Sequence, residues 1–283
     1  MQFAKLQGTG NDFVLVDGRQ FEADWPRLAL AVCDRHFGIG ADGLLVVLPS
    51  TNADIRMRIF NRDASEAEMC GNGIRCLARW LWEQGELPMA QEVVRVETKA
   101  GLRTVRLVRR GDELVGFQVG MGVPELRPAA IPVALSGEGP VLSHPLRVDG
   151  HDLSLTFVSM GNPHAVAFVD TPVAAFPLEH VGPFVEHHPL FPARINFEIA
   201  RVLGPGRLEA RVWERGAGPT MACGTGASAV AVAARLQGIG DNEVDITLPG
   251  GSLHLSWDGV GEVLLLGPAE LTFHGTWPGR VPA

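Results

Sequence analysis

The stretch MACGTGASAVAVAARLQG, residues 221–238, decides the fold because the chain contains a second segment with the same pattern. The earlier copy is MCGNGIRCLARWLWEQG, residues 69–85. Both copies read Cys-Gly-x-Gly, carry an alanine eight residues after the cysteine, and end in Gln-Gly. The alanines and leucines that follow each glycine pair are typical of a buried helix. Each copy therefore predicts a central helix that begins just after a cysteine.

The repeat extends beyond these helices at a constant offset of 153 residues. RIFNRDASEAEMC, residues 58–70, falls on RVWERGAGPTMAC, residues 211–223, and GTGNDFVLVD, residues 8–17, falls on GNPHAVAFVD, residues 161–170. A repeat with a period near 150 residues indicates two copies of one domain, since solenoid repeats are far shorter.

Strand-like segments surround the predicted helices. VRVET, residues 94–98, and LRTVRLV, residues 102–108, alternate apolar and polar residues as half-buried strands do. We therefore predict an α+β fold of two pseudosymmetric domains, each a mixed or antiparallel sheet wrapped around a central helix. The first domain is expected to span residues 1–120, with the tail 268–283 packing back on it, and the second residues 121–267. The Pro- and Gly-rich segment 121–140 is expected to link them.

Composition narrows the choice of partner. A chain of 283 residues with 46% hydrophobic and 20% charged residues is globular. The net charge of −8 offers no basic surface for a nucleic acid, so a small solute is the expected partner. No apolar run approaches the roughly 20 residues that cross a bilayer, and the first residues lack the pattern of a signal peptide. We expect a cytoplasmic protein that does not enter a membrane.

Four cysteines fall into two pairs of different character. Their spacing fits neither a disulfide framework nor a zinc site, so no metal is expected. Cys33 and Cys76 do not precede a glycine turn and are interpreted as small buried apolar residues. Cys70 and Cys223 stand at predicted helix starts, where unpaired backbone N–H groups lower a thiol pKa and bind carboxylates. These two are the candidates for chemistry.

A pair of such thiols suits racemisation. If the two copies face one another, a substrate carboxylate held at both helix starts has its α-carbon between the two sulfur atoms. One thiolate then removes the α-proton from one face while the opposite thiol delivers a proton to the other face. The helix starts also supply donors for the negative charge that develops.

No cofactor is expected. Pyridoxal phosphate needs a lysine for its Schiff base, and the chain has only Lys5, in a predicted strand, and Lys99, beside a predicted turn. Neither has a recognisable phosphate loop attached. The string GIGADG, residues 38–43, matches G-x-G-x-x-G, but no buried strand precedes it and no clear helix follows it, so it does not indicate a dinucleotide site.

The sequence resembles the diaminopimelate epimerases in a series of blocks that covers most of the chain. The blocks are KLQGTGNDFVLVD, RIFNRDASEAEMCGNGIRC, SMGNPHAV, ARINFE, VWERGAG, ACGTGASA, LPGG and GPAELTFHG. The resemblance implies a cytoplasmic homodimer of two pseudosymmetric domains. It also implies a cofactor-independent interconversion of LL- and meso-diaminopimelate, a step in bacterial lysine and cell-wall synthesis.

The resemblance also implies a role for each matching site residue. Cys70 and Cys223 match the two acid/base residues. The backbone N–H groups of Gly71, Asn72, Gly224 and Thr225 match those that bind the reacting carboxylate. The residues that match substrate-holding positions, mainly at the distal end, are Asn11, Asn61, Asn162, Asn196 and Arg215. Glu214 matches the group that receives the reacting ammonium, and His164 and Glu214 match positions that tune the thiols.

Two positions depart from the family pattern. Gly43 stands where some members have a substrate-contacting glutamine, so that contact is absent or made by another group. Phe273 stands where an aromatic residue is associated with dimer contact, and a phenyl ring keeps the packing but lacks a hydroxyl.

Three alternatives stay open at this level. A related two-base racemase acting on proline or hydroxyproline shares the expected architecture, although the two CG motifs and the asparagine set fit diaminopimelate better. A thiol redox protein also pairs two activated cysteines, yet nothing here resembles C-x-x-C. A non-catalytic amino-acid-binding module explains a pocket but leaves two helix-start thiols without a role.

Overall fold

Two compact units make up the computed structural model, which describes residues 1–88, 91–111 and 113–279. Unit 1 comprises Met1–Val119 together with Leu266–Ala283, and unit 2 comprises Gly120–Leu265. In sequence, unit 2 is therefore inserted between the two parts of unit 1.

Unit 1 contains two α-helices, a short 3-10 helix and a set of strands in the part of the chain that the structure describes. In chain order they are β1 Gln2–Gly8, β2 Asn11–Asp17, η1 Gly18–Gln20, α1 Trp25–Cys33, β3 Gly43–Leu48, β4 Ile55–Asn61, β5 Glu66–Ala67, α2 Gly71–Glu83, β6 Val93–Thr98, β7 Gly101–Arg110, β8 Glu113–Gly120 and β18 Glu270–Thr276.

Unit 2 repeats this order of elements. They are β9 His144–Val148, β10 His151–Ser159, β11 Pro163–Phe168, η2 Val173–Ala175, α3 Leu178–Glu186, β12 Asn196–Gly204, β13 Arg207–Glu214, β14 Gly218–Thr220, α4 Gly224–Leu236, β15 Glu243–Leu248 and β16 Gly251–Ser256. The chain returns to unit 1 within β17 Leu264–Gly267.

The two units pair their strands in the same way. In unit 1, β1–β2 is antiparallel, β2–β3 parallel, β3–β4 and β4–β5 antiparallel, β4–β6 parallel and β6–β7 antiparallel. The corresponding pairs β10–β11, β11–β12, β12–β13, β13–β14, β13–β15 and β15–β16 follow the identical sequence of directions. The predicted α+β class with two pseudosymmetric, mostly antiparallel halves is confirmed.

Helices α2 and α4 are the central helices of the two units. Residues 71–78 of α2 are buried without exception, and so are residues 226–234 of α4. A helix that is buried on all sides needs small or apolar residues all round, which the alanine-rich sequence of α4 supplies. The first turns of both helices are thereby held rigidly inside their sheets.

The Gln-Gly that closes each repeat ends its helix. Gly85 and Gly238 have φ values of +69° and +68°, a left-handed conformation that residues with a Cβ rarely adopt. Their N–H groups return to Trp82 O and Arg235 O. This glycine C-cap explains why both copies have the same spacing from the cysteine to the final glycine.

The segment 121–140 corrects one prediction from the sequence. It was expected to link the two domains, but it lies within unit 2, where Ile131 and Val133 are 0% and 4% exposed and belong to the hydrophobic core that contains Phe157 and Phe191. The backbone of Glu125 also pairs with that of Ser159 in an isolated antiparallel β-bridge. Its prolines and glycines shape an irregular layer of unit 2.

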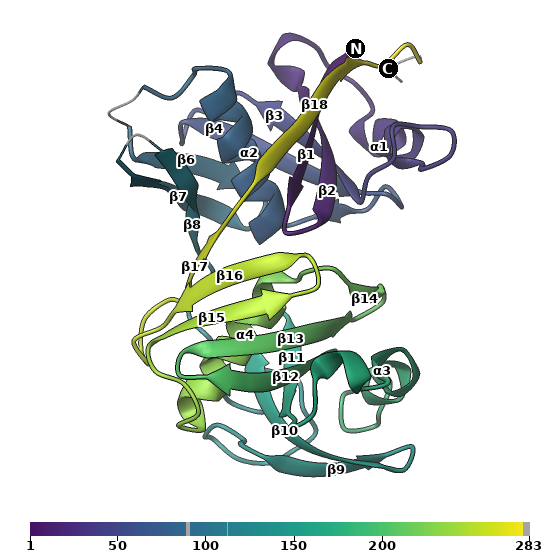
Figure 1. The fold of residues 1–283 in the computed structure, drawn as a ribbon. Helices are drawn as coiled ribbons and strands as arrows, with labels where there is room; N and C mark the ends of the chain where they lie inside the picture. Colours follow the sequence, from purple (N-terminus) through teal and green to yellow (C-terminus); the bar gives the residue numbers. More distant parts are fainter. Residues whose placement is uncertain (89–90, 112, 280–283) are drawn as a thin grey trace. The chain divides into compact units, whose positions relative to one another are not determined.

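The C-terminal strand completes the sheet of unit 1. Strand β18 pairs antiparallel with β1, and Figure 1 shows the yellow strand running beside the purple one. Met1 and Trp277 exchange backbone hydrogen bonds at the end of this pair. The two ends of the described chain therefore lie side by side in unit 1.

Candidate active site

Both predicted cysteines occupy the N-cap of a central helix. Cys70 has φ −141° and ψ 120°, and Cys223 has φ −119° and ψ 117°, so both are extended just before their helices begin. The Gly73 N–H donates to Cys70 Sγ at 3.5 Å, and the Gly226 N–H donates to Cys223 Sγ at 3.4 Å. Each sulfur atom therefore accepts a hydrogen bond from the helix start, where a negative charge is favoured.

The helix starts also present backbone donors. The first intrahelical bonds run from Ile74 N to Cys70 O and from Ala227 N to Cys223 O. Ahead of them lie the N–H groups of Gly71, Asn72, Gly224 and Thr225, for which an α-helix supplies no acceptor of its own. Such a turn is suited to a carboxylate.

In unit 1 the structure brings Asn11 and Asn72 together beside Cys70. Asn72 Nδ2 donates to Asn11 Oδ1 at 3.2 Å, and the Cys70 thiol donates to the same oxygen with a Sγ–Oδ1 distance of 3.8 Å. Asn61 lies at the exposed end of β4, where its amide donates to Ser65 Oγ at 2.9 Å. Gly43 is buried, and a Cβ there would come within 3.0 Å of Phe60 O.

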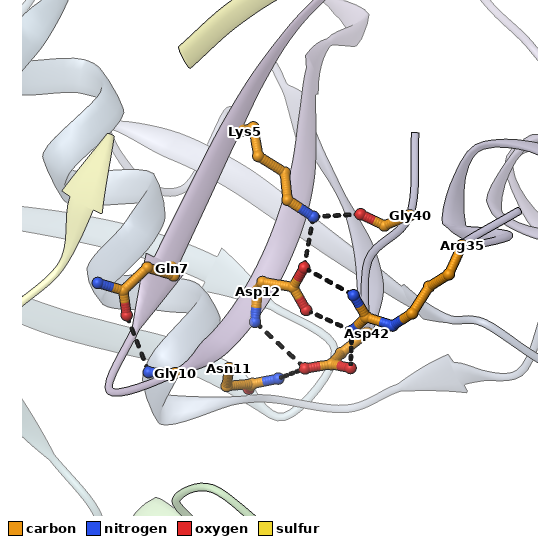
Figure 2. A network of polar contacts seen from close by, with 8 residues as sticks. All are labelled: Lys5, Gln7, Gly10, Asn11, Asp12, Arg35, Gly40 and Asp42. Carbon is orange, nitrogen blue, oxygen red and sulfur yellow. Dashed lines mark hydrogen bonds and ion pairs between the residues drawn. The ribbon is translucent and has the colours of Figure 1, made fainter. Parts of the chain in front are cut away.

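The other end of the Asn11 side chain enters a network of charged groups that the sequence analysis missed. Asn11 Nδ2 donates to Asp42 Oδ2 at 2.8 Å, and Arg35 Nη2 donates to Asp42 Oδ1 at 2.7 Å (Figure 2). Arg35 also contacts Asp12, which forms an ion pair with Lys5. The signal for Asp42 was the string GIGADG, which connects α1 to β3, whereas the dinucleotide motif follows a strand and opens a helix.

Asp12 makes this network sensitive to pH. Burial alone raises the pKa of its carboxyl group, but hydrogen bonds from Arg35 and Lys5 outweigh burial and lower the pKa to about 2. A pKa below the unfolded value of 3.8 stabilises the folded state above that value, and this stability is lost as the pH falls through 2.

We predict that Asp12→Asn lowers the free energy of unfolding by about 2 kcal/mol at pH 7. Urea unfolding of both proteins between pH 7 and pH 3 checks this, with Asp54→Asn, in an exposed pair with Arg95, as the control. The difference in unfolding free energy between Asp12→Asn and the unsubstituted protein should become smaller at the acid end of this range. A gap that is constant with pH would contradict the assignment.

In unit 2 a continuous row of polar contacts leads away from Cys223. Cys223 Sγ lies 3.3 Å from Thr225 Oγ1, which accepts from Asn162 Nδ2 at 3.3 Å. Asn162 Oδ1 lies 3.0 Å from His164 Nε2, and His164 Nδ1 lies 2.7 Å from Glu198 Oε1. The Thr225 hydroxyl group can donate to the sulfur atom or accept from its thiol. The family resemblance named His164 but not Glu198.

Glu198 is the buried end of this row. Both Glu198 and His164 are 0% exposed, and Glu198 Oε2 has no hydrogen-bond partner among the residues the structure describes. Burial raises the pKa of Glu198, while the charge of His164 and its hydrogen bond act against that rise. The pattern signal was weak, because a glutamate inside the strand segment NFEIA looks like an ordinary outward-facing residue.

The environment of Cys223 raises the pKa of its thiol well above the ordinary value. Burial is the main cause, and the carboxylate of Glu214 adds to it, whereas the hydrogen bonds from Thr225 and Gly226 lower it. Glu214 is half-buried and accepts from Thr220 Oγ1 at 2.6 Å. Burial also raises the pKa of Glu214 itself.

We predict that Glu214→Gln makes Cys223 more reactive without substrate present. Removing a neighbouring negative charge favours the thiolate, so the midpoint of the pH profile for iodoacetamide alkylation of Cys223 should fall by about one unit. Mass spectrometry of the Cys223 peptide measures this, and Glu209→Gln on the same strand is the matched control. An unchanged or higher midpoint would show that Glu214 does not act on the thiol.

Asn196 and Arg215 are joined through the backbone. Asn196 is 3% exposed, donates to Pro163 O at 2.7 Å and accepts from the Arg215 N–H at 2.9 Å. The Arg215 guanidinium is half-buried and donates to Ala193 O at 3.0 Å. Asn196 therefore spends both ends of its amide on main-chain groups and acts on the position of Arg215.

Comparison with known proteins identifies the family. The family model for diaminopimelate epimerase matches residues 3–126 and 156–272. The diaminopimelate epimerase of Moorella thermoacetica is 51% identical over 282 residues, which cover 98% of this chain and 99% of that protein. That of Desulfovibrio desulfuricans is 47% identical over 98% of each chain.

The chain belongs to the diaminopimelate epimerase family. More distant solved structures share its fold. A hydroxyproline epimerase from Agrobacterium vitis, solved with bound trans-4-hydroxy-L-proline, has a TM-score of 0.70 at 15% identity over 97% of this chain and 90% of that one. A phenazine biosynthesis protein of the PhzF family from Bacillus anthracis has a TM-score of 0.69 at 16% identity, covering 97% and 98%. Sequence identity thus separates this chain from the proline-type enzymes, although the diaminopimelate epimerase fold is common to both.

Among the described residues no three His, Cys, Asp or Glu side chains form a group that could hold a metal ion. None of the helices in the described ranges has the length and apolar character that crossing a bilayer needs. Cys33 and Cys76 are buried, as predicted, and burial raises their thiol pKa values, that of Cys33 to about 12.

Proposed function

We propose that this chain interconverts LL- and meso-2,6-diaminopimelate without a cofactor, as a step in lysine and peptidoglycan biosynthesis. The single observation that carries the mechanism is the repeated one: Cys70 and Cys223 each cap a central helix and each accept a hydrogen bond from its third N–H group. The names of the full-length relatives supply the substrate.

The proposed reaction is one proton removed and one returned. A cysteine thiolate takes the proton from the α-carbon, and the electron pair left behind is shared with the neighbouring carboxylate. The other cysteine thiol then gives its proton to the opposite face of the same carbon. In the reverse direction the two cysteines exchange roles, so atoms and charge balance in both directions.

Stabilisation of the intermediate falls to the helix starts. The charge that develops on the reacting carboxylate needs fixed donors, and the first N–H groups of α2 and α4, at Gly71, Asn72, Gly224 and Thr225, are of that kind. Glu214 supplies an acceptor for the reacting ammonium. Asn61 and Arg215 carry exposed or half-buried polar groups for the distal end of the substrate, where an amide and a guanidinium complement a zwitterion.

Asn11, Asn162 and Asn196 serve the site in part through their neighbours. Asn11 contacts Cys70, and Asn162 connects His164 to Thr225. This arrangement supports the proposed tuning of the Cys223 thiol by His164 and Glu214. The Asn196 side chain accepts from the Arg215 N–H and so fixes the backbone at Arg215.

The lysines support a reaction without pyridoxal phosphate. Lys5 is 8% exposed and bound to Asp12 and to Gly40 O, so its amine is occupied by structural contacts. Lys99 lies in the tight turn between β6 and β7.

We also propose a homodimer and a cytoplasmic location, both on the family resemblance. Phe273 in β18 is 47% exposed and packs edge-on against Phe3 at a ring distance of 6.0 Å. An exposed aromatic residue on an outer strand is suited to the contact that the resemblance implies.

Proton NMR in D2O tests the function. Purified, reduced protein is given LL-diaminopimelate with no added cofactor, and trans-4-hydroxy-L-proline is the control substrate. Deuterium at one α-position together with formation of the meso isomer is expected, with no exchange into the proline derivative. Absence of exchange into diaminopimelate from folded protein would refute the proposal.

A further inference from the structure

A row of hydrogen bonds with a single direction passes the Cys70 thiol in unit 1. Arg75 Nη2 donates to Asn72 Oδ1 at 2.9 Å, Asn72 Nδ2 donates to Asn11 Oδ1 at 3.2 Å, and Asn11 Nδ2 donates to Asp42 Oδ2 at 2.8 Å. Every step runs from donor to acceptor in the same sense. The row thus begins at a cation and ends at a carboxylate.

Its two ends fix that direction. A guanidinium has only donors and a carboxylate only acceptors, whereas an asparagine amide can turn over at little cost. Arg75 is 0% exposed and is held by Thr9 Oγ1, Gly71 O and Pro268 O. Asp42 is held by Arg35 and by the Asp12 N–H (Figure 2). With these ends in place, a reversed amide at Asn11 or Asn72 would set donor against donor.

The orientation of the Asn11 amide decides which of its two polar groups faces the sulfur atom of Cys70. Because Asp42 takes the Nδ2 group of Asn11, it is Oδ1 that faces Cys70 Sγ, at 3.8 Å. A carbonyl oxygen can accept from the thiol but offers nothing to a thiolate, so it favours the protonated form. An amide N–H in its place would favour the thiolate.

We propose that Asp42 and Arg75 are positioning residues that hold the side-chain amides of Asn11 and Asn72 in one orientation, so that Cys70 faces an acceptor, which favours its thiol form in the substrate-free protein. This inference rests on the acid/base role proposed for Cys70. It assigns a purpose to the ADG part of GIGADG and to the arginine of CGNGIRC, neither of which the reaction itself uses.

Other groups of unit 1 act on Cys70 in known directions. The Arg75 charge and the Gly73 N–H favour the thiolate. Cys76 is buried, and burial raises the pKa of its thiol, so it stays neutral. The negative charge of Asp42 acts against the thiolate from beyond Asn11. The Asn11 carbonyl therefore opposes the stabilisation of the Cys70 thiolate by the helix start and Arg75. Of these groups, only the Asn11 amide would reverse its effect on the thiolate by turning over.

Asp42→Asn tests the proposal, because an asparagine has one oxygen where Asp42 uses two. The Arg35 guanidinium can only donate, so it keeps the oxygen and Asn11 faces the NH2 group, which removes the constraint on the Asn11 amide. The readout is iodoacetamide alkylation of Cys70 between pH 6 and pH 10, followed by mass spectrometry of its peptide. We expect the midpoint for Cys70 to fall by about half to one pH unit. The midpoint for Cys223 in the same sample should not move.

Asp12→Asn is the matched control. It removes a carboxylate from the same Arg35 and changes the net charge equally, yet Asp12 makes no side-chain contact with Asn11. Asn11→Leu removes the oxygen altogether and should lower the Cys70 midpoint at least as far. Equal midpoints in Asp42→Asn and Asp12→Asn would overturn the proposal. If Asp42→Asn does not fold, a Cys70 midpoint in Asn11→Leu that does not fall below that of Asp12→Asn overturns it equally.

A kinetic readout completes the test. With diaminopimelate, in the direction of epimerisation in which Cys70 is the proton donor, Asp42→Asn should reduce kcat about 10-fold with less than about a 3-fold change in KM, since the proton donor is affected more than substrate binding. Alkylation needs no substrate, so the Cys70 profile judges this inference even if the NMR experiment rejects diaminopimelate.

Discussion

Serine at position 70 or at position 223 is expected to reduce kcat about 10³-fold in both directions of epimerisation, within the range that a positioned acid or base contributes. Each direction needs one base and one acid, and a serine hydroxyl is far too weak an acid to form the base at neutral pH. A coupled assay or chiral chromatography of the product measures the loss. Near-normal epimerisation by either variant would refute the two-thiol mechanism.

The helix caps make these variants clean tests. Serine is a strongly preferred N-cap residue, so Cys70→Ser and Cys223→Ser should keep α2 and α4 intact. Cys33→Ala is the matched control, since Cys33 is a buried cysteine at the end of α1 with no place in the proposed site. It should keep kcat within about 2-fold, because burial of an alanine there preserves the packing.

Glu198→Ala is expected to cost about 3–5 kcal/mol of unfolding free energy, the usual result of breaking a fully buried pair. His164 loses its Nδ1 partner, and neither residue can reach water because both are 0% exposed. The row from His164 through Asn162 to Thr225 then loses its fixed end. We expect kcat to fall about 10- to 100-fold as well, measured at a temperature where the variant is folded.

Two further variants separate loss of the buried hydrogen bond to His164 from the general effect of removing a glutamate side chain. Glu198→Gln keeps a hydrogen-bonding side chain of the same size beside His164, so it should cost less than half as much stability as Glu198→Ala. Glu179→Ala breaks an exposed pair with Arg211 in the same unit and should cost less than about 1 kcal/mol. If Glu198→Ala is no more costly than Glu179→Ala, the buried pair has no structural role.

The sequence predicted the parts of the fold that are encoded locally. The internal repeat, the two central helices and their cysteine starts follow from alternation, alanine content and Gly-x-Gly turns. The buried linker could not be predicted in this way, because Pro and Gly in segment 121–140 mark irregular backbone and say nothing about whether Ile131 and Val133 find a core.

The residues of the candidate site also fall into those that local sequence predicts and those that it does not. Cys70 and Cys223 could be named from the helix-start pattern, and the other site residues came from the family resemblance. Asp42 and Glu198 were missed since each acts through a neighbour that is distant in sequence: Asp42 lies 31 residues from Asn11, and Glu198 lies 34 residues from His164. Arg75 lies close to Asn72 in sequence, but an arginine in a helix is usually exposed, so its burial was not predicted. Only tertiary structure shows which amide or ring each of them orients.

The pairing of β1 with β18 has a consequence for synthesis on the ribosome. The sheet of unit 1 needs a strand from each end of the described chain, so it cannot close until β18 has left the exit tunnel. Unit 2 is continuous, and all of its strands emerge earlier. Since domains fold as units during translation, the half that is made second should become compact first. Until β18 has been made, Cys70 lies in a domain whose sheet still lacks its last strand.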